Sequence, residues 1–338
     1  MRQHAWTGAA IVALCAAAPT AAQQKPSFYE GKNINLYIGY SAGGGYDVYA
    51  RMIARHMARH VPGLGEIVPN NMPGAGSLRM TNWLYNVAPK DGSAFGAPGR
   101  GAAFEPLLVG EGTQFDASRF NWLGSANNEV SVCVSWENSG VKTIDDAKKK
   151  ELVVGGTGGS ADTDQFPKVL NAVIGTKMKL VTGYPGGNDI NLAMERGEVK
   201  GRCGWSWSSV VSTRANWLKE GKINVLVQLG MKKHEDLPNV PLVLDLASNQ
   251  EERQILRLVF ARQAMGRPYM APPDVPADRV KILRDAFMAT MRDKGFLAEA
   301  EKAKLEVDPV SGEEVQDIVK EAYETPKSVV KRTGEIVK

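Results

Sequence analysis

Short runs of apolar residues alternate along the chain with longer stretches in which apolar residues recur every three to four positions. The short runs predict buried strands and the longer stretches predict amphipathic helices. The expected strands cover residues 35–39, 67–68, 94–97, 130–136, 151–155, 179–182, 200–204 and 223–229. The expected helices cover residues 47–61, 76–87, 104–109, 144–149, 164–174, 189–196, 210–218, 279–294, 296–304 and 312–331. Repeated strand–turn–helix units predict an α/β fold with mostly parallel sheets covered by helices, in two blocks that meet near Ala126.

Glycine-rich turns occupy the same place in both blocks. One turn is Ser-Ala-Gly-Gly-Gly-Tyr-Asp at residues 41–47, and the other is Gly-Gly-Thr-Gly-Gly-Ser-Ala-Asp at residues 155–162. Each turn precedes an expected helix, whose free N–H groups and positive dipole end favour an anion. One such turn alone is more often a plain capped connection. Two matching turns at the carboxyl ends of strands predict one shared site for a carboxylate or a phosphate.

Arginine and tryptophan supply further candidates for ligand contacts. An arginine can bind a carboxylate through two parallel hydrogen bonds, although a surface or structural ion pair is its more common role. Arg100, Arg202 and Arg267 each follow a glycine. We favour Arg100, because its loop is expected at the same sheet edge as the first glycine turn. Trp205 and Trp207 follow an expected strand and either form an apolar wall for the ligand or pack between helix and sheet.

The sequence offers little that is typical of an enzyme. Residues 156–161 fit the dinucleotide-binding pattern Gly-x-Gly-x-x-Ala. The next expected strand, 179–182, lacks the acidic residue that such a site requires about twenty positions further on. His56 and His60 belong to an arginine-rich helix, a pattern more typical of a solvated face than of a metal site. We therefore expect no catalytic residues, no cofactor and no metal.

The charge balance, the N-terminus and the cysteines narrow the remaining classes. The formal net charge is +4, from 41 Lys and Arg against 37 Asp and Glu, so we expect no nucleic-acid partner. Residues 1–22 have the layout of a signal peptide cleaved near Ala22. The alternative, a membrane anchor, would need an apolar run of ~20 residues, longer than this one. The mature chain is expected in the periplasm, where Cys133 and Cys203 either form a disulfide or stay buried thiols.

Several motifs in a fixed order resemble those of a known family. Residues 41–47 resemble its Pro-Gly-Gly-x-x-Asp loop, residues 71–76 its Asn-x-Pro-Gly-Ala-Gly segment, and residues 88–92 its Ala-x-Pro-Asp-Gly turn. Further matches follow in the expected order at residues 184–187, 197–199, 221–226 and 237–241. The family is the solute-binding receptors of tripartite tricarboxylate transporters, the TctC-like Bug proteins. The resemblance runs from about Phe28 to the C-terminus.

The resemblance implies a type II periplasmic-binding-protein fold, with two lobes that each contain a mostly parallel sheet flanked by helices, joined by a two-stranded hinge. Lobe 1 would comprise residues 23–125 and 231–338, and lobe 2 residues 126–230. A small carboxylate, either a di- or tricarboxylate or an aromatic acid, would bind between the lobes of a monomer, which closes and docks on transporter subunits in the membrane. From the residues and the resemblance together, the expected ligand-binding residues are Ser41, Ala42, Gly43, Gly44, Gly45, Tyr46, Asp47, Arg100, Thr157, Gly158, Ser160, Ala161, Asp162, Thr163, Asp189 and Trp205.

The chain departs from the family pattern at positions where ligand identity is set. Ala42 replaces a proline, Gly45-Tyr46 replaces Pro-Thr, and residues 205–207 stand where many members have a phenylalanine and small polar residues. Residues 260–269 match the usual strand poorly. The resemblance therefore does not identify the acid. The alternatives to transport are a sensory co-receptor for the same ligands and an enzyme that uses the same cleft.

Overall fold

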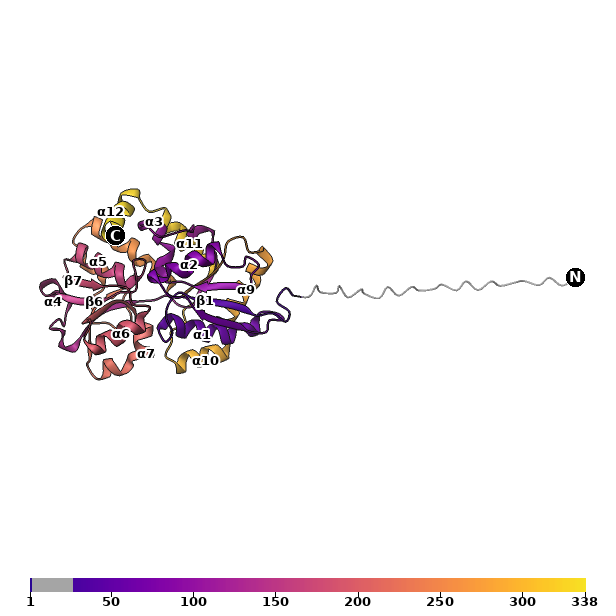
Figure 1. Cartoon of the computed structure of the whole chain (residues 1–338), viewed down its shortest axis with the longest axis horizontal. Helices are drawn as coiled ribbons and strands as arrows, with labels where there is room; N and C mark the ends of the chain where they lie inside the picture. The colour runs from indigo at the N-terminus through magenta and orange to yellow at the C-terminus, as the bar shows by residue number, and fades with distance from the viewer. Residues whose placement is uncertain (2–26) are drawn as a thin grey trace.

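The computed structural model describes Met1 and residues 27–338. The predicted signal peptide lies outside the described residues, apart from Met1. Figure 1 shows two α/β lobes side by side, each built on one sheet. The chain therefore has the two-lobed α/β architecture that the sequence predicts.

The first lobe contains a six-stranded sheet with the strand order β11-β4-β10-β3-β1-β2. Its strands are β1 (Ile34–Ile38), β2 (Ile67–Asn71), β3 (Ala94–Ala97), β4 (Asn121–Ser125), β10 (Pro268–Ala271) and β11 (Val310–Ser311). In β1 the apolar residues Ile34, Leu36 and Ile38 alternate with more exposed ones and join one core cluster. β1 pairs in parallel with β2 and β3, whereas β10 and β11 run antiparallel to their neighbours.

The second lobe contains a five-stranded sheet with the order β7-β6-β8-β5-β9. Its strands are β5 (Ser131–Trp136), β6 (Leu152–Gly155), β7 (Met178–Val181), β8 (Gly201–Ser206) and β9 (Ile223–Leu229). β6 pairs in parallel with β7 and β8, and β5 runs antiparallel to β8 and β9. β5 and β8 are buried almost throughout, as expected for strands covered on both faces.

Helices cover both faces of each sheet (Figure 1). On the first sheet, α1 (Gly45–Met57), α9 (Ala277–Met291) and α10 (Lys294–Lys302) lie on one face, and α2 (Leu78–Asn86), α3 (Glu105–Leu108) and α11 (Gly312–Tyr323) on the other. On the second sheet, α4 (Ile144–Lys149) and α5 (Asp162–Ile174) lie on one face, and α6 (Gly187–Arg196) and α7 (Trp207–Lys219) on the other. The remaining helices are α8 (Gln250–Phe260) and α12 (Lys327–Val337). Short 3-10 helices are η1 (Ala58–His60), η2 (Ala75–Ser77), η3 (Arg100–Ala103), η4 (Ala117–Arg119), η5 (Glu137–Ser139), η6 (Val243–Leu246) and η7 (Ala261–Met265).

Two paired segments carry the chain between the lobes. One follows β4 and the other precedes β10. The N–H of Ala126 donates to the carbonyl of Arg267 at 3.0 Å, and the N–H of Gly266 donates to that of Asn127 at 2.8 Å. β5 and β10 each begin after such a crossing, and they run antiparallel to the strands beside them. Both sheets are consequently mixed, which corrects the expectation of mostly parallel sheets.

The helices near the C-terminus connect the two lobes. α12 packs against α5 and α8, and also against α3. One core cluster includes residues of both sheets together with residues of these helices. The second crossing lies at Gly266 and Arg267 rather than directly after β9. The lobe boundaries remain a proposal, and these contacts lead us to place residues 231–265 with lobe 2 instead of lobe 1.

Some elements differ from those that the sequence predicts. The expected helix at residues 312–331 is two helices, α11 and α12, separated at Pro326. Proline lacks an N–H donor and disfavours the helical conformation in the residue before it, which explains the break. β4, α8, β10 and β11 were not predicted. Of the three strands, β4 contains a glycine, β10 begins with a proline and β11 has only two residues. These features weaken the alternation of apolar and polar residues on which strand prediction rests.

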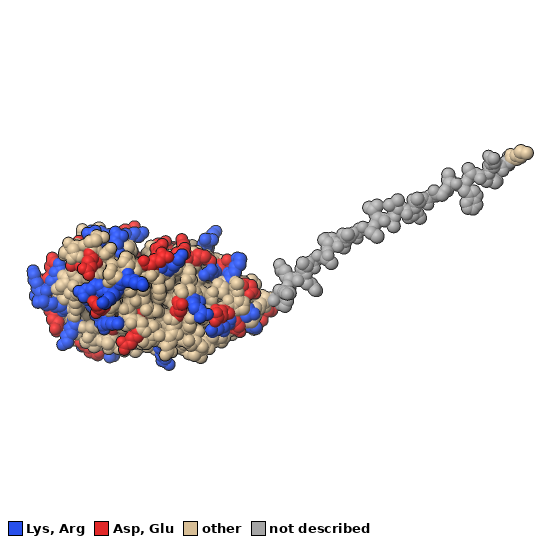
Figure 2. Space-filling view, turned by 90° about the horizontal axis from the view of Figure 1, so that it is seen from above, with Lys and Arg blue, Asp and Glu red and all other residues tan. Residues whose placement is uncertain are grey.

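Side chains of both charge signs lie on the face of the molecule in view. Figure 2 shows Lys and Arg interspersed with Asp and Glu over both lobes. No described helix is long and apolar enough to cross a membrane. A preference for one sign of ligand charge must therefore come from a local site rather than from this face as a whole.

Candidate functional site

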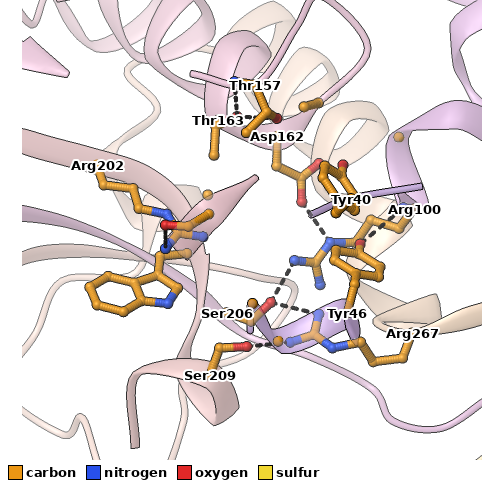
Figure 3. A pocket seen from close by; sticks show the side chains of 17 residues that line it. Tyr40, Tyr46, Arg100, Thr157, Asp162, Thr163, Arg202, Ser206, Ser209 and Arg267 are labelled. Atoms are coloured by element: carbon orange, nitrogen blue, oxygen red, sulfur yellow. Dashed lines mark hydrogen bonds and ion pairs between the residues drawn. The ribbon is translucent and has the colours of Figure 1, made fainter. Parts of the chain in front are cut away.

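A cavity lies where the ends of both sheets face each other (Figure 3). The cavity has a volume of about 50 Å³. The lining residues are Tyr40, Gly44, Gly45, Tyr46, Arg100, Gly101, Thr157, Ala161, Asp162, Thr163, Gly187, Arg202, Gly204, Trp205, Ser206, Ser209 and Arg267. They come from both lobes, so the cavity is closed by the contact between them.

The first glycine turn reaches the cavity through its last glycines. α1 begins at Gly45, two residues before the predicted start, so Gly44, Gly45 and Tyr46 line the cavity. A Cβ on Gly45 would lie 1.9 Å from the hydroxyl oxygen of Ser209, which leaves no room for a side chain. Ser41, Ala42 and Gly43 lie outside the lining. The end of this turn therefore lies at the cavity and its beginning does not, while ligand binding by these residues stays a prediction.

Asp47 supports the first turn from behind. Its carboxylate accepts hydrogen bonds from the Gly43 N–H, from Arg51 Nε and from Asn71 Nδ2, each at 2.9 Å. Burial alone would raise the pKa of Asp47, but the bonds from Arg51, Gly43 and Asn71 lower it. Asp47 is not among the cavity residues. The structure thus places it as a support of the turn, in contrast to the expected ligand contact.

The second turn divides between the cavity and the opposite lobe. Thr157, Ala161, Asp162 and Thr163 line the cavity, and α5 begins at Asp162. The hydroxyl of Ser160 instead donates to the carbonyl of Gly76 in η2 of the first lobe, at 2.9 Å. Gly158 also faces η2 and lies outside the lining. Some residues of this turn therefore line the cavity, and others contact the opposite lobe.

A second contact between the lobes lies beside the cavity. The hydroxyl of Ser41 donates to Asp189 Oδ2 at 2.6 Å. Residues 39–43 read Gly-Tyr-Ser-Ala-Gly and match the nucleophile-elbow pattern Gly-x-Ser-x-Gly, which was missed in the sequence. Among the described hydrogen bonds, none joins Ser41 to a histidine. Ser41 and Asp189 thus form a bond across the cleft, outside the cavity lining.

Arg100 forms an ion pair between the two lobes. It begins η3 in the first lobe, and its Nε lies 2.6 Å from Asp162 Oδ2 at the start of α5. Its Nη2 donates to Ser131 at 3.1 Å and to Ser206 at 2.8 Å. Burial lowers the pKa of Arg100, but the charges of Asp162, Tyr46 and Glu129 and the hydrogen bond to Asp162 together raise it above its usual value. Arg100 lines the cavity, although its charge is already paired with that of Asp162.

Arg267 lies beside Arg100 on the same side of the cavity (Figure 3). Its guanidinium donates to Ser206 at 2.8 Å and to Ser209 at 2.7 Å, and it lies 3.4 Å from Glu129 Oε2. The guanidinium carbon also stacks 4.7 Å from the ring centre of Tyr46. The sequence favours Arg100 over Arg267, but both arginines line the cavity.

Arg202 differs from the other two arginines. It is 9% exposed, and its Nη1 donates to the carbonyl of Gly187 and to Asn191 Oδ1, both at 3.0 Å. Its guanidinium carbon lies 4.6 Å from the ring centre of Trp205. Burial lowers the pKa of Arg202 to about 9, and the positive charges of Arg214 and Arg267 contribute. Among the described residues, no carboxylate forms an ion pair with it.

Tryptophan and cysteine residues settle two alternatives that the sequence left open. Trp205 and Trp207 both pack in one core cluster; Trp205 also lines the cavity, and Trp207 donates to Asp236 at 2.9 Å. Cys133 of β5 and Cys203 of β8 form a disulfide. The bond lies directly after Arg202 in β8 and fixes the strand that carries this arginine.

Helix N-termini converge on the cavity. Gly45, Asp162 and Gly187 are the first residues of α1, α5 and α6, and Ser206 directly precedes α7. Such ends present free N–H groups and positive dipole charge. Together with an unpaired buried arginine, they favour a small anion in the cavity.

Several lining residues were missed in the sequence. They are Tyr40, Gly101, Gly187, Gly204, Ser206 and Ser209. A usable signal existed for two of them, since Gly187 precedes the predicted helix at residues 189–196 and Ser206 follows the predicted strand at residues 200–204. The strand–turn–helix reasoning applied to the two glycine turns covers these positions equally well.

Comparisons with known proteins support the fold. No protein-family model matches the chain. A Cupriavidus necator protein described as "UPF0065 protein in gbd 5'region" is 22% identical over 354 residues, which cover 98% of each chain. The solved structure of the periplasmic binding protein BugD is 18% identical, with a TM-score of 0.74 over 90% of this chain and 99% of that one. The chain has the fold of the Bug-type periplasmic binding proteins.

Two further structural neighbours were solved with ligands. MatC from Rhodopseudomonas palustris, with bound malate, is 16% identical, with a TM-score of 0.70 over 91% of this chain and 99% of that one. A second R. palustris protein, with adipate, has the same identity and TM-score over 90% of this chain and 97% of that one. The resemblance found in the sequence is confirmed by these neighbours, and so is the two-lobed fold.

Proposed function

We propose that the protein is an exported solute-binding protein that captures a small carboxylate between its lobes and delivers it to a tripartite tricarboxylate transporter. The observation that carries this proposal is the buried cavity, into which both lobes direct helix N-termini and arginine side chains. Malate and adipate in two structural neighbours support a carboxylate as the ligand class.

Binding proceeds by closure of the two lobes. In an open form, the solute reaches the cavity walls on one lobe, and bending at the paired crossings brings the other lobe over it. The Gly76 N–H then donates to the carbonyl of Thr157 at 3.0 Å, and Ser41 reaches Asp189. These contacts exist only when the lobes meet, so they stabilise the closed form that a transporter would recognise.

The experiment is a ligand screen on the purified exported protein. Melting temperatures are measured with a panel of mono-, di- and tricarboxylates and with the corresponding neutral amides, and each acid that shifts the melting point is titrated by calorimetry. A ligand that binds only the native state raises the melting temperature, so at least one acid and none of its amides should do so. If no carboxylate shifts the melting point, or if a bound acid is chemically converted, the proposal is wrong.

The transporter partner is tested separately. A ligand-loaded protein should be retained by membranes that contain the transporter subunits more strongly than the ligand-free protein, because only closure presents the docking surface. Equal retention of both forms, together with retention by a sensor protein in the membrane, would favour the sensory role instead.

A further inference from the structure

The arginines around the cavity differ in whether a carboxylate of the protein already forms an ion pair with them. Arg100 pairs with Asp162 at 2.6 Å, and Arg267 lies 3.4 Å from Glu129. Arg202 has only a carbonyl oxygen and an amide oxygen as acceptors among the described residues. One guanidinium at this site is therefore left without a counter-charge.

The helix N-termini are largely matched by acidic residues of their own. Asp47, Asp162 and Asp189 lie in the first turns of α1, α5 and α6. A carboxylate in the first turn offsets the positive end of the helix dipole. The N-termini and Arg202 together therefore favour one small anion but offer little positive charge to a second one, except at α7, whose first turn has no acidic residue.

The side of the cavity opposite Arg202 is suited to a neutral group. Figure 3 shows Tyr40 and Tyr46 beside Arg100, away from Arg202. The two rings are stacked with their centres 4.7 Å apart. Here Arg100 Nη1 and Arg267 Nε are buried without a hydrogen-bond acceptor. A neutral oxygen or a water molecule can satisfy these N–H groups without adding a charge.

We propose that the ligand is a small monocarboxylate, whose single carboxylate pairs with Arg202 while its neutral remainder lies toward Arg100 and the two tyrosine rings. This inference rests on the proposed function and specifies the ligand class within it. The small cavity agrees with a small acid, since about 50 Å³ is room for only a few water molecules.

A second carboxylate on the ligand would be poorly accommodated. It would approach Arg100 or Arg267, where Asp162 and Glu129 already supply a negative charge. A buried charge without a partner is strongly unfavourable, and a like charge nearby adds to the cost. Malate and adipate, the acids in the two neighbours, both carry two carboxyl groups, so this chain would differ from them in ligand charge.

The test uses acids matched in carbon number. Dissociation constants are measured at pH 7 by calorimetry for propionate and malonate, butyrate and succinate, and 2-methylbenzoate and phthalate, with lactate and citrate added. The monocarboxylate of the pair that binds best should bind at least about tenfold more tightly than its dicarboxylate, the equivalent of one charge-assisted hydrogen bond. Equal or tighter binding of the dicarboxylate overturns the inference but leaves the proposed function standing. Binding of no acid overturns both.

Two variants test the charge argument directly. Arg202→Gln should weaken the best monocarboxylate by at least about tenfold through loss of its charge partner. Arg214→Gln is the matched control, because Arg214 lies nearby, is half-buried and does not line the cavity. It should change the affinity by less than about threefold, the scatter expected for a screened charge. If the two variants lose affinity equally, Arg202 does not receive the carboxylate.

A gain-of-function variant separates exclusion by charge from exclusion by size. Asp162→Asn removes the carboxylate that occupies Arg100, so the ratio of dicarboxylate to monocarboxylate affinity should rise by about tenfold. Glu129→Gln frees Arg267 in the same way and replaces the first variant if that one does not fold. An unchanged ratio in a folded variant overturns the charge argument. If neither variant folds, the ranking of the matched pairs in the unmodified protein decides.

Discussion

The N–H of Gly76 donates to the carbonyl oxygen of Thr157 at 3.0 Å, so main chain of one lobe touches main chain of the other at this point. Gly158 lies directly against the same segment. A Cβ on Gly158 would lie 2.3 Å from the nitrogen of Gly76, closer than real Cβ atoms approach other atoms. The glycines of the second turn therefore serve lobe closure as well as the approach to a ligand.

Replacing Gly158 with alanine should hinder closure and also cost its own lobe some stability, because Gly158 has a φ of 137°, which alanine adopts only with strain. The added methyl group meets the main chain of η2, which cannot move aside as a side chain can. If the closed fraction falls to about a tenth, the apparent dissociation constant rises about tenfold. Calorimetry with the carboxylate that binds best measures the affinity. X-ray scattering in the presence of this ligand should show a larger radius of gyration for the variant than for the unmodified protein.

Gly159→Ala is the control for this variant. Gly159 neighbours Gly158, but a Cβ there would meet nothing within 4 Å. It should bind ligand as the unmodified protein does. Equal affinities for Gly158→Ala and Gly159→Ala would show that closure does not depend on the contact between the second turn and η2.

Asp47→Ala should act on stability first and on binding only indirectly. The substitution leaves the Gly43 N–H, Arg51 and Asn71 without their common acceptor. The free energy of unfolding of the ligand-free protein should fall by about 2 kcal/mol, as for the loss of a buried hydrogen-bond acceptor. Urea unfolding measures this change.

Asp189→Ala is the counterpart of that variant. Asp189 accepts the hydroxyl of Ser41 across the cleft, so its removal should weaken ligand binding with a smaller change in the stability of the ligand-free protein. If Asp47→Ala leaves stability unchanged and abolishes binding, then Asp47 contacts the ligand after all, as the sequence suggested.

The sequence predicted the parts of the site that follow from local chain geometry. A glycine turn between a strand and a helix places its last residues at the helix N-terminus, and Gly44, Gly45, Ala161 and Asp162 lie there in the cavity lining. The fold followed from the same units and from the order of the motifs. Helix starts were predicted two residues late in α1 and α5, because Asp47 and Asp164 were taken as the first helical residues rather than as residues of the first turn.

The sequence could not show which arginine lacks a partner. Arg267 lies near Glu129 only because the two crossing segments pair with each other, and Arg100 meets Asp162 only when the lobes come together. Such pairings depend on tertiary structure between distant segments. Arg202 stands out only after these carboxylates have been assigned, which is why the sequence favoured Arg100.

Reduction of the disulfide between Cys133 and Cys203 should lower stability markedly. The bond joins residues 70 positions apart, and the loop-entropy relation gives about 4 kcal/mol for a loop of this length. Urea unfolding with and without reductant should show this difference. A Cys133→Ala, Cys203→Ala double variant should match the reduced protein and no longer respond to reductant. Identical unfolding midpoints with and without reductant would contradict the bond's role.

His234 should make stability depend on pH in the neutral range. Its Nε2 lies 2.9 Å from Glu306 Oε1, and Asp236 and Glu129 add negative charge nearby. The hydrogen bond to Glu306 raises the pKa of His234 above its ordinary value of 6.5, although burial opposes this. A raised pKa in the folded state means that the stabilisation is fully present below the unfolded-state pKa and is lost as the pH rises through the folded-state pKa.

The free energy of unfolding should therefore fall as the pH rises from about 6 to about 8, the range in which a histidine with a raised pKa titrates. His234→Gln removes the titrating group and should flatten this dependence. Glu306→Gln keeps the histidine but removes its main partner, so the pKa of His234 should return toward its ordinary value and the slope should shrink. Because the pair lies away from the cavity lining, neither variant should change the ranking of carboxylates. Unfolding curves at several pH values decide the matter: parallel profiles for the unmodified protein and both variants would mean that another group causes the pH dependence.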